Sequence, residues 1–141
     1  MFQLHERLMT DTLLVGEFPL CLLLLSRDAN YPWTILVPKR ADIKEIYQLN
    51  SADRNQLLHE SCVLAEAMQG LFSPDKLNIA TIGNMVPQLH MHHVARTKTD
   101  VAWPGPVWGA VTAIDYSEET LASIQVSLQT RLADELLNKN P

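Results

Sequence analysis

Gln88, His90 and His92 alternate with the apolar residues Leu89 and Met91. Side chains two residues apart on a β-strand point to the same side of the sheet. If this segment is a strand, the three polar side chains share one face and the two apolar ones face the core. Titrating side chains that cluster on one face are typical of a functional site. The pattern therefore predicts a pocket on that face of the sheet.

Two imidazoles on one face suit chemistry at phosphorus. A neutral imidazole can attack phosphorus and form a covalent phosphoramidate, which divides one displacement into two easier ones. Histidine needs little activation at neutral pH, since its unperturbed pKa is about 6.5. A second imidazole can donate a hydrogen bond to the phosphate oxygens, and backbone N–H groups can stabilise their charge. We therefore predict that the protein handles a phosphate ester, and that His93, on the apolar side, is structural.

The elements that would position these residues follow from apolar patterning. The apolar run at 18–25 is shorter than the roughly 20 residues of a membrane helix, so it predicts a strand buried on both faces. Apolar residues three to four apart predict a long helix capped by Ser51 and ended at Ser73. A similar stripe follows a capping-box-like start at Asp115. We expect strands at 13–15, 20–25, 33–37, 77–82, 88–95 and 107–113, and a short helix at 42–49.

Composition restricts the class of protein. The chain has 141 residues, 47% of them hydrophobic, and a net charge of −5, which fits a single domain over 1–141. Short loops between consecutive strands favour antiparallel pairing and an α+β fold. No basic run is present, so no nucleic-acid polymer is expected as a partner. We also expect no membrane span, a cytoplasmic location, and reduced, buried thiols at Cys21 and Cys62.

Residues 88–96 resemble the motif strand of the histidine-triad (HIT) superfamily of nucleotide hydrolases and transferases. The family's pattern is His-x-His-x-His with alternate hydrophobic residues, often followed by an arginine. Aligned on Arg96, His92 matches the third histidine, His90 the second and Gln88 the first. The whole chain resembles a bacterial subgroup in which the glutamine-first motif is the usual form.

The resemblance implies a HIT-like fold, with an antiparallel sheet of about five strands, one long helix packed on it and a C-terminal helix. It extends beyond the motif, because 36–40 is similar to the family's strand that ends in Val-x-Pro-Lys. The family's second histidine is the nucleophile, which gives this role to His90, with His92 and Gln88 beside it as catalytic residues. The implied reaction cleaves a dinucleoside polyphosphate or a nucleoside phosphoramidate through a covalent nucleotidyl-histidine.

The resemblance also implies ligand contacts and partners. Asp28 is placed like the family residue that holds ribose hydroxyls, and Asn84 is expected to donate to a phosphate. Arg96 is expected to face the pocket mouth, where it would contact the ligand, or else the solvent. No cofactor or resident metal is expected, although a divalent cation could accompany a polyphosphate substrate. The expected ligand is a small nucleotide. Because members of the family are commonly homodimers, the resemblance also predicts a homodimer.

Two alternatives stay open at this stage. The same scaffold could bind nucleotides without catalysing a reaction, since a fold does not guarantee an activity. His90 and His92 could instead be metal ligands, because His-x-His on a strand also suits zinc. The metal interpretation needs a third ligand, and no nearby acid or cysteine has an obvious spacing.

Overall fold

Five strands form one antiparallel sheet in the computed structural model, which describes residues 1–137. The elements in chain order are α1 (Glu6–Asp11), β1 (Thr12–Glu17), β2 (Cys21–Ser26), β3 (Trp33–Pro38), the 3-10 turn η1 (Ile46–Gln48), α2 (Ser51–Phe72), β4 (Lys76–Ala80), β5 (Met91–Arg96) and α3 (Glu118–Arg131).

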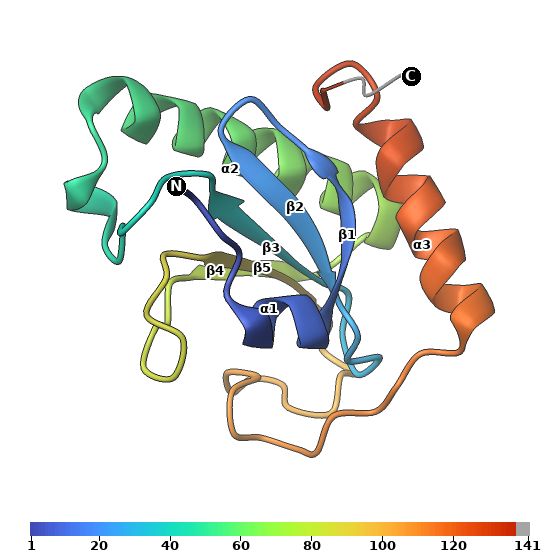
Figure 1. The fold of residues 1–141 in the computed structure, drawn as a ribbon. Coiled ribbons are helices and arrows are strands. Elements are labelled where there is room, and N and C mark those ends of the chain that lie inside the picture. Colours follow the sequence, from blue (N-terminus) through green and yellow to red (C-terminus); the bar gives the residue numbers. More distant parts are fainter. Residues whose placement is uncertain (138–141) are drawn as a thin grey trace.

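The strands lie across the sheet in the order β1-β2-β3-β5-β4, and each neighbouring pair is antiparallel. Helices α2 and α3 pack on one face, whereas α1 and the N-terminal segment lie on the other (Figure 1). This arrangement confirms the predicted α+β fold with a five-stranded antiparallel sheet, one long helix and a C-terminal helix.

Strand β2 lies in the interior of the sheet and is covered on both sides. Every residue from Cys21 to Leu25 is buried. Leu23 and Leu25 join the cluster beneath α2 and α3, while Leu22 and Leu24 face α1. Full burial of one such leucine contributes about 1.5–3 kcal/mol. The prediction of a strand buried on both faces is therefore confirmed.

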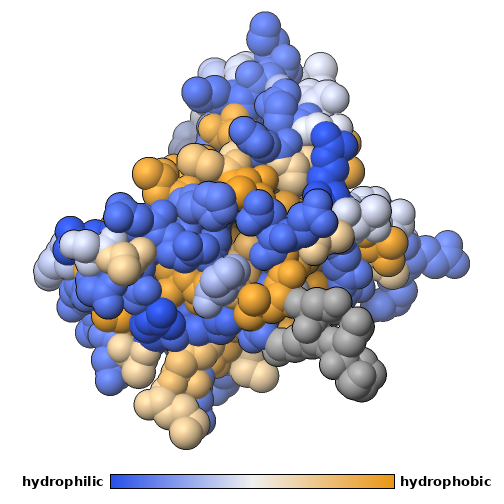
Figure 2. Space-filling model, turned by 90° about the horizontal axis from the view of Figure 1, so that it is seen from above, coloured by the Kyte–Doolittle hydropathy of each residue, from blue (hydrophilic) through white to orange (hydrophobic). Residues whose placement is uncertain are grey.

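Helix α2 follows its predicted stripe but starts one residue away from the predicted cap. The N-cap is Asn50 and not Ser51, because the Asn50 side chain accepts a hydrogen bond from the main-chain N–H of Asp53 at 2.8 Å. The predicted end is confirmed, since Ser73 has a left-handed conformation with a φ of 47°. Hydrophilic residues cover most of the face seen from above, on the side of α2 (Figure 2).

Two predicted elements are wrong. No strand forms at 107–113, where turns follow one another and Gly109 has a φ of 77°. The extended backbone that a strand needs is interrupted there. The helix predicted at 42–49 is reduced to the single turn η1, because Asp42 has a φ of 58° and Glu45 is extended, with a φ of −128° and a ψ of 150°.

The two cysteines differ in burial. Cys21 is buried in β2 as predicted, and burial raises the pKa of its thiol. The prediction for Cys62 is wrong, because its side chain is exposed on α2. It lies one residue beyond Ser61, which faces the sheet, and adjacent residues of a helix point in different directions.

A buried carboxylate fastens the turn between β1 and β2 to α2. Glu60 is 1% exposed, and its oxygens accept hydrogen bonds from the main-chain N–H groups of Leu20 and Cys21, both at 2.9 Å. The side-chain amide of Gln56 donates to the same carboxylate at 2.7 Å. Buried polar groups cost stability unless they are paired, and here each has a partner.

We expect Glu60→Ala to lower the free energy of unfolding by about 2–4 kcal/mol, because two buried N–H groups lose their acceptor. Gln56→Ala, which removes a donor but leaves both main-chain contacts, should cost less than about 1 kcal/mol. Urea denaturation of both variants measures the difference. Equal losses would contradict the role of Glu60 as the acceptor that fixes the turn.

Candidate active site

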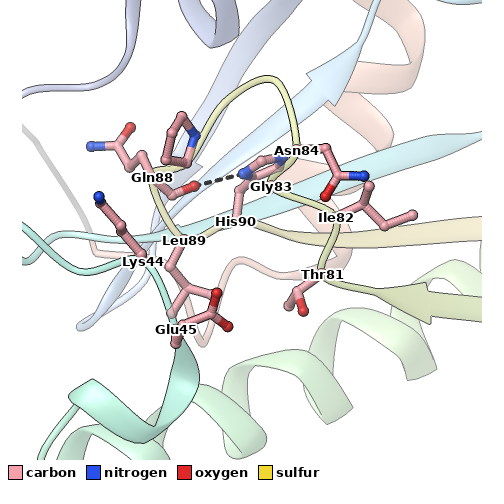
Figure 3. Close-up of a pocket in the computed structure, with 10 residues that line it drawn as sticks. Lys44, Glu45, Thr81, Ile82, Gly83, Asn84, Gln88, Leu89 and His90 are labelled. Carbon is pink, nitrogen blue, oxygen red and sulfur yellow. Dashed lines mark hydrogen bonds between the residues drawn. The ribbon is translucent and has the colours of Figure 1, made fainter.

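His90 lies at the end of the loop that precedes β5 and is 5% exposed. Its Nδ1 is 2.7 Å from the main-chain oxygen of Gln88. A carbonyl oxygen can only accept a hydrogen bond, so the proton of this contact is on Nδ1. In the neutral ring Nε2 then has the lone pair, and the ring points toward Gly83 and Asn84 (Figure 3). The contact therefore presents an unprotonated nitrogen to the loop that lines the pocket.

His92 is held in the opposite tautomer. In the register of β3 and β5, Ile35 lies opposite His92, so Trp33 is its diagonal neighbour on the same face. The indole Nε1–H of Trp33 donates to Nδ1 of His92 at 2.9 Å. Because an indole can only donate, Nδ1 of His92 has the lone pair and Nε2 has the hydrogen of the neutral ring. His92 is therefore a hydrogen-bond donor at Nε2.

Aromatic rings enclose His92. Its ring centroid lies 4.8 Å from that of His90 and 5.1 Å from that of Trp108. Burial lowers the pKa of His92 to about 3, with smaller contributions from the nearby His90 and His93. Desolvation disfavours the charged imidazolium, so the ring is neutral at physiological pH.

A pocket with a volume of about 510 Å³ opens beside His90 (Figure 3). This size lies within the range of about 300–1,000 Å³ that is usual for small-molecule sites. Two loops supply its walls, one before η1 and one between β4 and β5. The lining residues are Lys44, Glu45, Thr81, Ile82, Gly83, Asn84, Pro87, Gln88, Leu89 and His90.

The prediction that the strand already includes Gln88 is wrong, although Gln88 lines the same pocket as His90. Strand β5 begins at Met91, whose partner Leu36 ends the pairing with β3. The N–H of Leu89 instead donates to the main-chain oxygen of Ile43 at 2.9 Å, so the chain before Met91 is not yet paired in the sheet. The amide of Gln88 points away from the His90 ring (Figure 3), and only its main-chain oxygen contacts that ring.

The structural role predicted for His93 is confirmed. His93 is fully buried, with Nδ1 3.1 Å from the oxygen of Met91 and Nε2 2.7 Å from the hydroxyl of Ser61 on α2. Burial lowers its pKa to about 4. Leu89 and Met91 pack in the core under α2, as predicted.

The structure places two predicted ligand residues away from the pocket. Arg96 is 1% exposed; its guanidinium donates to the carboxylate of Asp100 at 2.8 and 3.0 Å and to Asn78 at 2.8 Å. Asp28 accepts from the main-chain N–H of Asn30 at 2.9 Å, beyond the opposite end of β3 from the pocket. Of the three predicted ligand residues, Asn84 lines the pocket, whereas Arg96 and Asp28 do not.

Sequence reasoning missed two residues of the site. Lys44 lines the pocket and brings a positive charge to it. It lies in a loop, where no helical or strand periodicity in the sequence indicates which way a side chain points. Trp33 packs against the core, and its indole also sets the tautomer of His92. The pairing register of β3 and β5 would have placed it there, and one sequence does not state that register.

In residues 1–137, no group of three or more His, Cys, Asp or Glu side chains is arranged to hold a metal ion. No helix in this part of the chain is long and apolar enough to span a bilayer. The absence of a resident metal stays a prediction.

Comparisons with known proteins agree with the geometry. A histidine triad protein from Marinobacter aquaeolei VT8 is 51% identical, with 96% of this chain and 98% of that chain covered and a TM-score of 0.93. The histidine triad protein blr8122 from Bradyrhizobium japonicum is 41% identical (92% and 97% covered, TM-score 0.91). The histidine triad protein SMc02904 from Sinorhizobium meliloti 1021 is 39% identical (94% and 98% covered, TM-score 0.91). None of the curated proteins compared with the chain matches it.

The family model of the HIT domain matches residues 7–99, which include every strand of the sheet and both histidines of the site. The three structures are similar to this chain in sequence over nearly its whole length, and their folds are similar as well. This chain therefore belongs to the HIT family.

Proposed function

We propose that the protein is a nucleotide hydrolase or nucleotidyl transferase in which His90 forms a covalent adduct with the phosphorus of a nucleoside phosphate derivative. Membership of a family that typically acts on nucleotides supports the ligand class. The 2.7 Å contact between Nδ1 of His90 and the oxygen of Gln88 supports the nucleophile, because it keeps the lone pair on Nε2.

In the first step, the lone pair of His90 Nε2 attacks phosphorus, and the bond from phosphorus to the leaving group breaks. The leaving group departs with the electron pair and takes up a proton. The His90 ring becomes positively charged, and its Nδ1–H bond to the carbonyl of Gln88 becomes charge-assisted and stronger. Hydrogen bonding of the charged form thus stabilises the adduct.

In the second step, water attacks phosphorus and the phosphorus–nitrogen bond breaks. The electron pair returns to Nε2 of His90, and the products are a nucleoside monophosphate and a proton. A transferase would use another hydroxyl or phosphate in place of water. His92 supports both steps as a neutral donor, whose Nε2–H hydrogen bonds to the phosphoryl oxygens.

The pocket offers further groups to an anionic ligand. The exposed side chains of Asn84 and Lys44 are proposed to hold phosphate oxygens by a hydrogen bond and an ion pair. The proposed substrates are a dinucleoside polyphosphate and a nucleoside phosphoramidate. The independence from a cofactor, the homodimer and the cytoplasmic location stay predictions of the same proposal.

His90→Ala should reduce turnover of a nucleoside phosphoramidate by at least a hundredfold, because the covalent route is lost. Rapid quenching of the wild-type reaction followed by mass spectrometry should show a nucleotidyl adduct on His90. His59→Ala, at an exposed histidine of α2, is the matched control and should keep full activity. Nucleotide binding without an adduct or turnover would favour the non-catalytic interpretation.

Trp33→Phe should lower kcat about tenfold, with KM within about threefold, since loss of a positioned proton donor typically costs 10²–10⁴ and the substitution removes only the bond that orients it. Without the indole N–H, Nδ1 of His92 can take the proton and Nε2 lose it. Trp108→Phe is the control, because Trp108 contacts the same ring without this hydrogen bond. Equal kcat for the two variants would argue against a role for the tautomer.

The neutrality of His92 can be measured through stability. Its folded-state pKa of about 3 lies below the ordinary 6.5, so below pH 6.5 the unfolded chain binds a proton that the folded one does not. Stability is therefore lost as pH falls, by about 2 kcal/mol for this residue between pH 7 and pH 5. His92→Gln should reduce the change in unfolding free energy over this interval by that amount. An identical pH dependence in both proteins would show that the fold does not lower the pKa of His92.

A further inference from the structure

The side-chain amide of Gln88 contacts the N-terminal segment at two points. Its Oε1 accepts from the main-chain N–H of His5 at 2.9 Å, and its Nε2 donates to the main-chain oxygen of Gln3 at 2.8 Å. One amide thus satisfies a donor and an acceptor of the same extended stretch, as a peptide group of a neighbouring strand does. The side chain fastens residues 3–5 to the pocket loop.

Apolar packing anchors the same segment. Phe2 and Leu4 are half-buried against a cluster that includes Val37 of β3 and Val86 of the pocket loop. In Figure 1 the chain runs from the N-terminus to α1 along this side of the sheet. His5 connects the segment to α1, because its Nδ1 accepts a hydrogen bond from the main-chain N–H of Arg7 at the start of that helix. The segment is therefore held at both ends of the Gln88 contact.

The main chain of Gln88 has a different partner. Its oxygen accepts the Nδ1–H of His90, the bond that orients the proposed nucleophile. We propose that Gln88 is a positioning residue: it fastens the N-terminal segment to the pocket loop and thereby fixes the peptide whose carbonyl orients His90. The inference rests on the proposed function, and it explains why this chain has an amide at the first position of the motif.

The shape of the two side chains accounts for the choice of residue. The oxygen and nitrogen of a carboxamide lie side by side and can meet the N–H and C=O groups of one strand segment together. The two nitrogens of an imidazole point in divergent directions, so a histidine at position 88 could bond to His5 or to Gln3 but not to both. A glutamine is therefore the side chain that suits this contact.

The test compares Gln88→Ala with a protein lacking residues 2–4, which removes the other partner of the contact. Two readouts do not depend on activity: hydrogen exchange of the His5 amide, and the nitrogen chemical shifts that report the tautomer of the His90 ring. In Gln88→Ala we expect faster exchange and a mixture of tautomers. With a nucleoside phosphoramidate as substrate, kcat should fall about tenfold while KM changes less than about threefold (about 1.4 kcal/mol of barrier).

The double variant shows whether the two changes act through one contact. If Gln88 acts through the segment, its kcat will be close to that of either single variant, because coupled changes do not add. Gln88→Glu keeps the acceptor for the His5 N–H but loses the donor to Gln3, and should be intermediate. Slow exchange of the His5 amide in Gln88→Ala, a single unchanged tautomer, or multiplied losses in the double variant would each overturn the proposal. Inactivity of the wild type would refute the proposed function instead, while exchange and tautomer would still decide the role of Gln88.

Discussion

The hydrogen bond from His90 Nδ1 to the main-chain oxygen of Gln88 is the interaction on which the site depends. With the other tautomer, the ring would present an N–H to the pocket and could not attack phosphorus. The bond requires a carbonyl two residues earlier that has no partner in the sheet. The chain supplies it because β5 begins only at Met91, so this start of the strand is a condition for the role proposed for His90.

Three histidines that are close in sequence have different surroundings, because each ring has a different hydrogen-bond partner. A carbonyl fixes the tautomer of His90, the Trp33 indole fixes that of His92, and the Ser61 hydroxyl meets His93 under α2. Alternation along β5 decides which ring faces the pocket side and which faces the core. The chemistry of the motif is therefore set jointly by strand geometry and by partners that lie up to 59 residues away in sequence.

Local pattern predicted the five strands of the sheet, the long helix and the inward side of His93, because apolar periodicity reports burial directly. Local pattern failed where the position of a side chain depends on residues that are distant in sequence but close in space. Gln88 obeys the alternation in sequence, but its strand partner ends too early for the geometry to follow. The pairing register of β3 and β5 places Trp33 beside His92, and the shape of a loop places Lys44 at the pocket. Apolar periodicity encodes neither the register nor the loop shape. The family resemblance selected His90, which lines the pocket, yet it did not indicate that Arg96 is enclosed.

The burial of Arg96 has a consequence for His92. Arg96 holds the carboxylate of Asp100 at 2.8 Å, and its hydrogen bonds lower the pKa of Asp100 to about 2. Asp100 also accepts from the main-chain N–H groups of Ala102 and Trp103, at 3.1 and 2.8 Å, so one ion pair organises the turn that follows β5. That turn leads into the segment from which Trp108 packs against the His92 ring. The segment that follows the Arg96–Asp100 ion pair thus supplies one of the rings that enclose His92, and burial keeps His92 neutral.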